Sequence, residues 1–191
     1  MKKFKRRGAV ISTHLSGYEV ELLTSLVTQL VEMVSDGEPQ EFERPAEPSD
    51  PFLAWAQDLE SDPSEPEVPD DPVMQRLFPN PYPHDPAAAS DFRRFTERDL
   101  KGKKISEAQL VLGRLEQTQQ GTDELRITAA EVDPWLRTLT SVRLAVATRL
   151  GITDAESAEE LGELGEDDPR AFMLSVYDWL GFAEETLLSA L

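Results

Sequence analysis

The spacing of apolar residues along the chain predicts four amphipathic helices. The first follows Ser16-Gly17-Tyr18-Glu19, which has the form of a capping box: the serine hydroxyl accepts a free N–H and the glutamate reaches back. Behind this box, apolar residues recur every three or four positions, as on one face of a helix. They are Leu22, Leu23, Leu26, Val27, Leu30, Val31 and Val34, and Asp36-Gly37 ends the segment.

Three further helices are expected in the second half of the chain. The first of these begins at Ser106. The second begins at Thr128-Ala129-Ala130-Glu131 and has Pro134 close to its first turn, and the third runs from about 170 to 191. Because four amphipathic helices can bury one another, we interpret their apolar faces as a shared core. The alternative for residues 187–191 is the seam of a homodimer. The faces comprise Leu110, Leu112 and Leu115; Val132, Trp135, Leu136, Leu139, Val142, Val146 and Leu150; and Phe172, Val176, Trp179, Leu180, Ala183 and Leu187.

Two short segments predict strands. Residues 9–13 are rich in β-branched side chains, and residues 124–128 alternate polar and apolar positions after Gly121. Each runs directly into a predicted helix, so the two strands can pair beside the helices. The sequence therefore predicts one domain over residues 1–191, mainly α, with a small two-stranded β element and a long insert.

The insert, residues 37–72, is acidic and rich in proline. It holds 12 acidic residues, one basic residue and eight prolines, for a net charge of −11. Proline prevents long helices and self-repulsion prevents compaction, so we predict a flexible, extended segment. Its apolar stretch, Phe52-Leu53-Ala54-Trp55, has two interpretations. It is a loop that docks one aromatic side chain, or a peptide that binds a partner or covers the protein's own basic residues.

Little in the sequence predicts catalysis. The chain has no Cys, which excludes thiol nucleophiles, disulfides, Cys-based zinc sites and Fe–S clusters, and its two histidines, His14 and His84, stand far apart. No nucleophile elbow, phosphate-binding loop or His-Glu-x-x-His motif is present. The eight acidic residues in 154–168 are typical of a solvated face and do not match a calcium loop. We predict a non-enzymatic protein without metal or cofactor.

The charge of the whole chain limits its partners. The formal net charge is −18, so phosphate backbones repel the molecule as a whole. Because the insert carries a net charge of −11, the remaining residues together carry a net charge of only −7. No apolar run is long enough to span a bilayer, and no apolar signal-peptide core follows the basic start. We predict a cytoplasmic protein that does not contact membranes.

Basic residues gather in two places and are the candidate binding residues. A cationic surface with interleaved aromatics can hold nucleic-acid phosphate or an acidic protein partner. The alternative is that these groups pair with the protein's own carboxylates. The candidates are Lys3, Lys5, Arg6 and Arg7 near the start, beside Lys2 and Phe4, and Arg93, Arg94, Arg98, Lys101, Lys103 and Lys104, beside Phe92 and Phe95.

One family resemblance adds a function. Residues 71–82 predict a short turn of helix that leads into Arg76-Leu77-Phe78-Pro79-Asn80-Pro81-Tyr82. A basic helix at 92–100, the Ser106 helix, Trp135-Leu136 and Tyr177-Asp178-Trp179-Leu180 follow in that order. This order resembles the actinobacterial family of oxidative-stress transcriptional regulators called AosR.

The resemblance implies a cytoplasmic regulator of stress and sulfur-metabolism genes, with a sigma factor or RNA polymerase as its protein partner and possible contact with DNA. A chain without Cys has to sense an oxidant through its methionines, a ligand or a partner. The alternative is an adaptor that binds proteins and never touches DNA, and an unrecognised hydrolase comes third.

Overall fold

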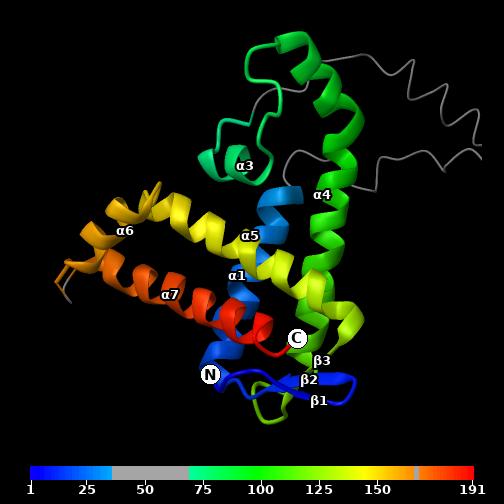
Figure 1. The fold of residues 1–191 in the computed structure, drawn as a ribbon, viewed down its shortest axis with the longest axis vertical. Helices are drawn as coiled ribbons and strands as arrows, with labels where there is room; N and C mark the ends of the chain where they lie inside the picture. The colour runs from blue at the N-terminus through cyan, green and yellow to red at the C-terminus, as the bar shows by residue number, and fades with distance from the viewer. Residues whose placement is uncertain (36–68, 166–167) are drawn as a thin grey trace, which may run out of the picture.

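Four long helices share the main hydrophobic core in the computed structural model, which describes residues 1–35, 69–165 and 168–191 (Figure 1). The mainly helical fold predicted from the sequence is confirmed. The long helices are α1 (Gly17–Ser35), α4 (Pro86–Glu116), α5 (Val132–Leu150) and α7 (Pro169–Leu188). The shorter elements are β1 (Lys5–Arg7), β2 (Val10–Thr13), α3 (Pro72–Leu77), β3 (Leu125–Thr128), the 3-10 turn η2 (Ala129–Glu131) and α6 (Ala155–Gly162).

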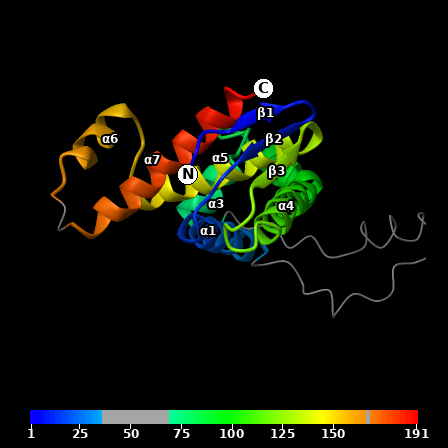
Figure 2. The ribbon, with the colours of Figure 1, turned by 90° about the horizontal axis from the view of Figure 1, so that it is seen from below.

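Helix α5 is the centre of the core. It contacts α1, α3, α4 and α7, and it lies between α7 on one side and α1 with α4 on the other (Figure 2). Trp135, Leu139 and Val142 on its apolar face are buried, as the periodicity predicts. Phe172 was predicted on the buried face of α7 but is 53% exposed. The first turn of α7 lies at the margin of the core, and there Met173 packs against it instead.

The sheet has three strands where the sequence predicts two. β2 pairs antiparallel with β3, as expected, and Ile11 lies opposite Ile127. β1 adds a third antiparallel strand at the edge of β2, with Lys5 opposite Ser12. Its three residues are charged and exposed, so no alternation of apolar and polar residues marks it as a strand. Phe4, directly before it, is buried and fixes β1 to the core.

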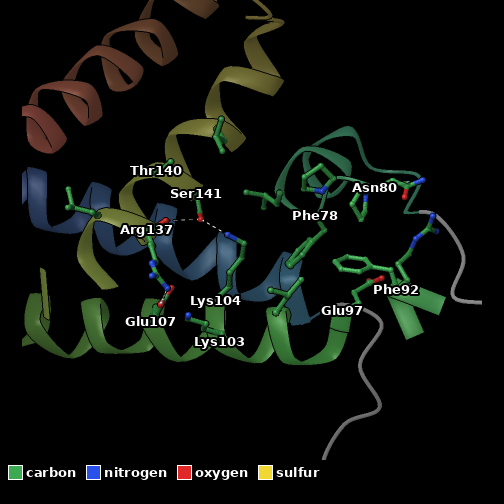
Figure 3. Close-up of a pocket in the computed structure, with 17 residues that line it drawn as sticks. Phe78, Asn80, Phe92, Glu97, Lys103, Lys104, Glu107, Arg137, Thr140 and Ser141 are labelled. Carbon is green, nitrogen blue, oxygen red and sulfur yellow. Dashed lines mark hydrogen bonds and ion pairs between the residues drawn. The ribbon is translucent and has the colours of Figure 1, made fainter. Parts of the chain in front are cut away.

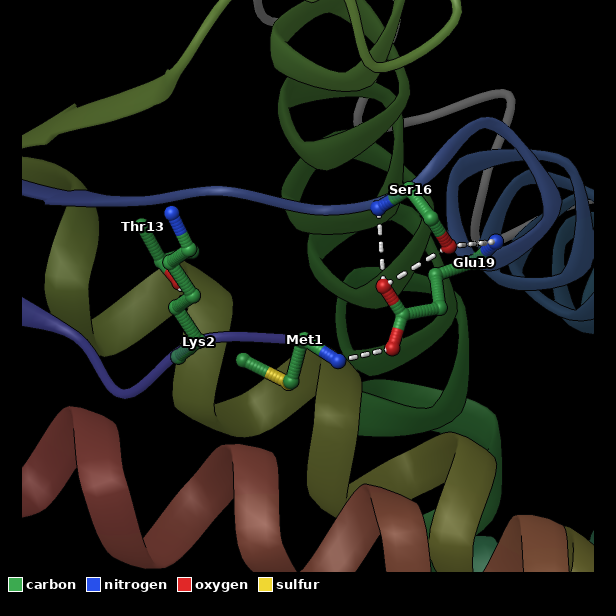
Figure 4. A network of polar contacts seen from close by, with 5 residues as sticks. All are labelled: Met1, Lys2, Thr13, Ser16 and Glu19. Carbon is green, nitrogen blue, oxygen red and sulfur yellow. Dashed lines mark hydrogen bonds and ion pairs between the residues drawn. The ribbon is translucent and has the colours of Figure 1, made fainter.

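The capping box at the start of α1 forms as predicted (Figure 4). The Ser16 hydroxyl accepts from the Glu19 N–H at 3.3 Å, and the Glu19 carboxylate accepts from the Ser16 N–H at 2.8 Å. The amino group of Met1 donates to the same carboxylate. Thr13 donates its hydroxyl proton to the carbonyl oxygen of Lys2. The first strand segment is therefore held to the first turn of α1.

Helix α4 corrects the prediction of two separate helices at 92–100 and from Ser106. It runs without interruption from Pro86, with Asp85 accepting from the Ala88 N–H at 3.0 Å as its N-cap. The Ser106 hydroxyl does not cap a helix but donates to the carbonyl oxygen of Lys103 at 2.9 Å. Gly102 alone costs only about 1 kcal/mol relative to alanine, which is too little to end a helix.

Most of the predicted acidic insert, residues 37–68, lies outside the described residues, and so does its Phe52–Trp55 segment. The end of the predicted range belongs to the folded part. Asp71 is the N-cap of α3 and accepts from the Val73 N–H at 2.8 Å, and Pro72 is the first residue of that helix. The predicted C-terminal end of the insert lies too late in the chain, because acidic residues and proline are typical of helix starts as well as of flexible segments.

The start of η2, which leads directly into α5, is fixed by a second capping box that also holds α4. The Glu131 carboxylate accepts from the Thr128 N–H at 2.7 Å and from the Arg114 guanidinium at 2.6 Å. Burial alone would raise the pKa of Glu131, but the hydrogen bonds from Thr128 and Arg114 outweigh it, so this pKa lies below its ordinary value of 4.5. A charged Glu131 therefore stabilises the folded state.

Replacing Glu131 with alanine should lower the free energy of unfolding by about 1–2 kcal/mol at neutral pH, because the cap and the ion pair are both lost. With a depressed folded pKa, this contribution is complete above 4.5 and is lost as the pH falls through that folded pKa. Urea unfolding of wild type and Glu131→Ala over a pH series measures it. The exposed Glu116→Ala control should stay within about 0.5 kcal/mol of wild type. If the difference in unfolding free energy between wild type and Glu131→Ala does not decrease in acid, a charged Glu131 is not the stabilising group.

Candidate binding surface on helix α4 and the adjoining cavity

The N-terminal half of α4 stands outside the helical core. At 31 residues α4 is about 46 Å long, whereas α1 and α5, with 19 residues each, span about 28 Å. Its residues Ala108, Val111 and Leu115 are buried. Between Ala89 and Ala108, no residue of the helix is fully buried. We refer to residues 90–107 as the α4 arm (Figure 1). Six of the ten candidate basic residues lie on this arm.

One flank of the arm carries Arg94, Arg98 and Lys101. Steps of four and three residues place them along one line on the helix. The Arg94 guanidinium lies over the Phe95 ring at 4.9 Å, and Phe95 is 65% exposed. Lys101 pairs with Glu97 at 2.8 Å. This outer flank therefore combines exposed guanidinium groups with an exposed aromatic ring.

The other three basic residues of the arm, Arg93, Lys103 and Lys104, line a cavity of about 560 Å³ (Figure 3). The cavity lies between α4, α5 and the segment that follows α3. The six basic residues that look like one cluster in sequence thus divide between two flanks of the same helix. The cavity walls are apolar and comprise Leu77, Phe78, Pro79, Pro81, Phe92, Leu100, Leu136 and Leu144.

Lys104 reaches from α4 towards α5 at the polar end of this cavity (Figure 3). Its Nζ donates to Ser141 Oγ at 2.9 Å and lies 5.8 Å from the centre of the Phe78 ring. Burial lowers the pKa of the Lys104 ammonium below its ordinary value of 10.5; nearby Glu107 opposes this effect and Arg137 adds to it. Glu107 itself pairs with Arg137 at 3.1 Å. Among the described residues, no carboxylate forms an ion pair with Lys104.

Helix α3 holds the outer wall of the cavity in place. Arg76 donates to the carbonyl oxygen of Ile152 at 2.8 Å, and Arg149 pairs with Asp71 at 2.6 Å. The hydrogen bond from Arg149, followed by the N–H of Val73, keeps the pKa of Asp71 below its usual value. These contacts clamp α3 to the C-terminal part of α5. The following segment, with Phe78 and its two prolines, is consequently positioned over Lys104.

The N-terminal basic residues do not join the arm. Lys3, Lys5 and Arg7 are exposed on or beside the edge strand β1, and Arg6 donates to the carbonyl oxygen of Leu191 at 2.5 Å. The sheet lies near the C-terminal end of α4, and the arm is the opposite half of that helix (Figure 1). Charged side chains on an edge strand oppose pairing with other sheets, which gives this cluster a structural role.

Internal pairing accounts for only some of the candidate basic residues. Lys101 is paired with a carboxylate, Lys104 is half-buried, and Arg93 is engaged in a contact. Within the part of the chain that the structure describes, the remaining arm residues Arg94, Arg98 and Lys103 form no ion pair, and neither do Lys3, Lys5 and Arg7. The cavity itself was not predicted, because its walls come from three elements that are distant in sequence.

The acidic run at 154–168 serves helix ends where the structure describes it. Asp154 accepts from the Ser157 N–H at 2.8 Å and caps α6. Asp168 caps α7, and the Arg170 guanidinium lowers its pKa to about 2. Across residues 1–35, 69–165 and 168–191, no three His, Asp or Glu side chains are grouped to hold a metal ion. None of the helices in these ranges is long and apolar enough to cross a bilayer.

A family model described as a domain of unknown function, DUF2017, matches residues 1–191. The chain belongs to the DUF2017 family. No curated protein and no solved structure matches it. The DUF2017 match covers the α4 arm and the cavity and assigns them no activity. The resemblance to AosR regulators remains a prediction.

Replacing Lys104 with methionine should raise the free energy of unfolding by up to about 1 kcal/mol. The variant keeps the apolar stem but removes a partly desolvated ammonium that pairs with no carboxylate of the described residues. The lowered pKa of Lys104 indicates that folding disfavours its charged form. Chemical unfolding at neutral pH measures the difference. Lys103→Met, at an exposed position of the same helix, is the matched control and should leave stability unchanged. A loss of stability in Lys104→Met would show instead that the lysine is a structural anchor.

Proposed function

We propose that the protein is a non-enzymatic regulator that binds a protein of the transcription machinery through the outer flank of the α4 arm. The observation that carries this proposal is the combination of Arg94, Phe95 and Arg98 on a helical segment outside the core. Arginine and aromatic side chains dominate the energetic centres of protein interfaces.

Charge and shape favour a protein partner over bare DNA. The chain has a net charge of −18, and its two exposed basic clusters lie at opposite ends of α4 rather than along one face. A DNA-binding protein gains most of its affinity from a continuous basic surface that neutralises several phosphates. The exposed Phe95 instead suits an apolar partner surface with an acidic rim.

The family resemblance supports a partner in the transcription machinery. The AosR-like order of segments includes Arg76–Tyr82 and the basic helix, which are the outer wall of the cavity and the arm. AosR regulators act on transcription of stress genes, which points to a sigma factor or RNA polymerase as the acidic partner. The absence of Cys means that any response to oxidants has to come from another source than a thiol switch.

Charge reversal on the arm tests the proposal. The full chain is immobilised, and binding of RNA polymerase holoenzyme from the same organism is measured by biolayer interferometry after nuclease treatment. Arg98→Glu should weaken binding at least tenfold, and Arg94→Glu with Arg98→Glu should abolish it. The matched control is Arg126→Glu on β3, where the arginine side chain is 71% exposed and the charge change is the same.

Each outcome has a defined meaning. Equal loss in Arg98→Glu and Arg126→Glu would show that net charge alone, not the arm, governs binding. No binding of holoenzyme or isolated sigma factor would remove the transcription machinery as the partner and leave the adaptor alternative. DNA is tested separately with a promoter fragment: arm-dependent binding that falls steeply with salt would establish DNA as the partner instead.

A further inference from the structure

The cavity beside the arm has the features of a small-molecule site. Its volume of about 560 Å³ falls in the range of ligand pockets, about 300–1,000 Å³, and its walls are mostly apolar with a few polar groups at one end. We propose that it binds a small molecule with an apolar body and one anionic group, such as a medium-chain carboxylate. Lys104 is the residue that holds the anionic group.

The charge of the lining indicates an anionic ligand. Four basic and two acidic side chains line the cavity, which gives a formal charge of +2 inside a chain of −18. The two acidic residues are already engaged, Glu97 by Lys101 and Glu107 by Arg137. The basic lining residues are Arg93, Lys103, Lys104 and Arg137.

Lys104 is the best-placed of these groups. An ammonium has three N–H donors, and one of them is used by Ser141 Oγ at 2.9 Å. Ser141 in turn donates to the carbonyl oxygen of Arg137 at 2.8 Å, which fixes the orientation of its hydroxyl. The two remaining donors of Lys104 have no hydrogen-bond acceptor among the described residues. A carboxylate in the cavity would accept them in a charge-assisted bond and neutralise the half-buried charge.

The apolar part of the site is preformed. Asn80 accepts from the Tyr82 N–H at 3.0 Å, so the backbone across Pro81 is held in a turn. Tyr82 contacts Phe92 edge-on, with ring centres 6.1 Å apart, and links this turn to α4. Because α3 is bound to α5 through Arg76 and Arg149, the cavity wall that follows α3 needs little rearrangement to accommodate an alkyl chain. A preformed pocket loses less entropy on binding.

A peptide of a partner protein is the other occupant to consider. It would approach from the exposed flank of the arm, where Arg94 and Phe95 lie, and these residues do not line the cavity. The cavity ends at a single half-buried ammonium and holds a compact volume. These two features favour one small anion with a hydrocarbon tail, and ligand binding at this site does not depend on the proposed binding of a protein by the arm.

Isothermal titration calorimetry with hexanoate, octanoate, decanoate and dodecanoate, each below its micelle concentration, tests the site in the full chain. Decanol serves as the uncharged probe of the same length as decanoate. Wild type should bind at least one carboxylate of the series, and should bind decanoate about tenfold or more tightly than decanol. Lys104→Met should lose this preference and bind both probes alike, whereas Lys5→Met on the remote strand β1 should keep it.

Two further measurements locate the binding. Methyl NMR resonances of Leu77, Leu100, Leu136 and Leu144 should shift on titration, and those of Leu23 on α1 should not. Leu100→Glu places a carboxylate on the exposed rim, where it should weaken carboxylate binding by repulsion without unfolding the protein. The proposal is wrong if no carboxylate of the series binds, if Lys104→Met keeps the preference, or if the shifts occur elsewhere. The partner measurement on the arm uses no ligand, so either proposal can fail without the other.

Discussion

The difference in length between α4 and its neighbours determines which part of the molecule stays exposed and available for binding. A helix of 31 residues cannot be buried along its whole length by neighbours of 19 residues, and its buried side chains beyond Ala89 are Ala108, Val111 and Leu115, all in its C-terminal half. An isolated stretch of helix is marginal in water, but here the buried half provides the nucleus and the Asp85 cap secures the other end. The arm is thus a continuation of the core that remains open to solvent.

The cavity follows from the same arrangement. Because the arm extends past the main contacts of α5, a space remains between the two helices, and α3 closes it from outside through Arg76 and the Asp71–Arg149 pair. Lys104 occupies this space with a hydrogen bond to Ser141 and, within the described ranges, without a carboxylate partner. A residue that costs stability where an apolar side chain would fit is typical of a functional position. The arm and the cavity share α4, so a ligand on one flank lies within one helix diameter of a partner on the other.

Local signals allowed much of the fold to be predicted from the sequence. The capping boxes at Ser16 and Thr128 and the apolar spacing of α1 and α5 each depend on residues within a few positions of one another. Strand β1 could not be recognised, because Lys5, Arg6 and Arg7 form a strand only through pairing with β2. The break expected before Ser106 was wrong for a related reason: a serine followed by a glutamate resembles a helix start even inside a continuing helix.

The candidate site was predicted in part. The basic residues of 93–104 were identified from their charge, but the division into an outer flank and a cavity flank depends on helical phase across the whole of α4. The role of Lys104 depends on Ser141 and Phe78, which lie far from it in sequence and reach it only through tertiary packing. No local pattern encodes such a contact.

Hydrogen–deuterium exchange of the full chain, free and bound to RNA polymerase holoenzyme, tests the account most directly. It predicts that amides of residues 90–107 exchange faster than those of residues 108–116 in the free protein and become protected in the complex, because the arm holds no fully buried side chain and a partner would cover it. Equal protection of both halves of α4 in the free protein, or no change in the arm on binding, would contradict it.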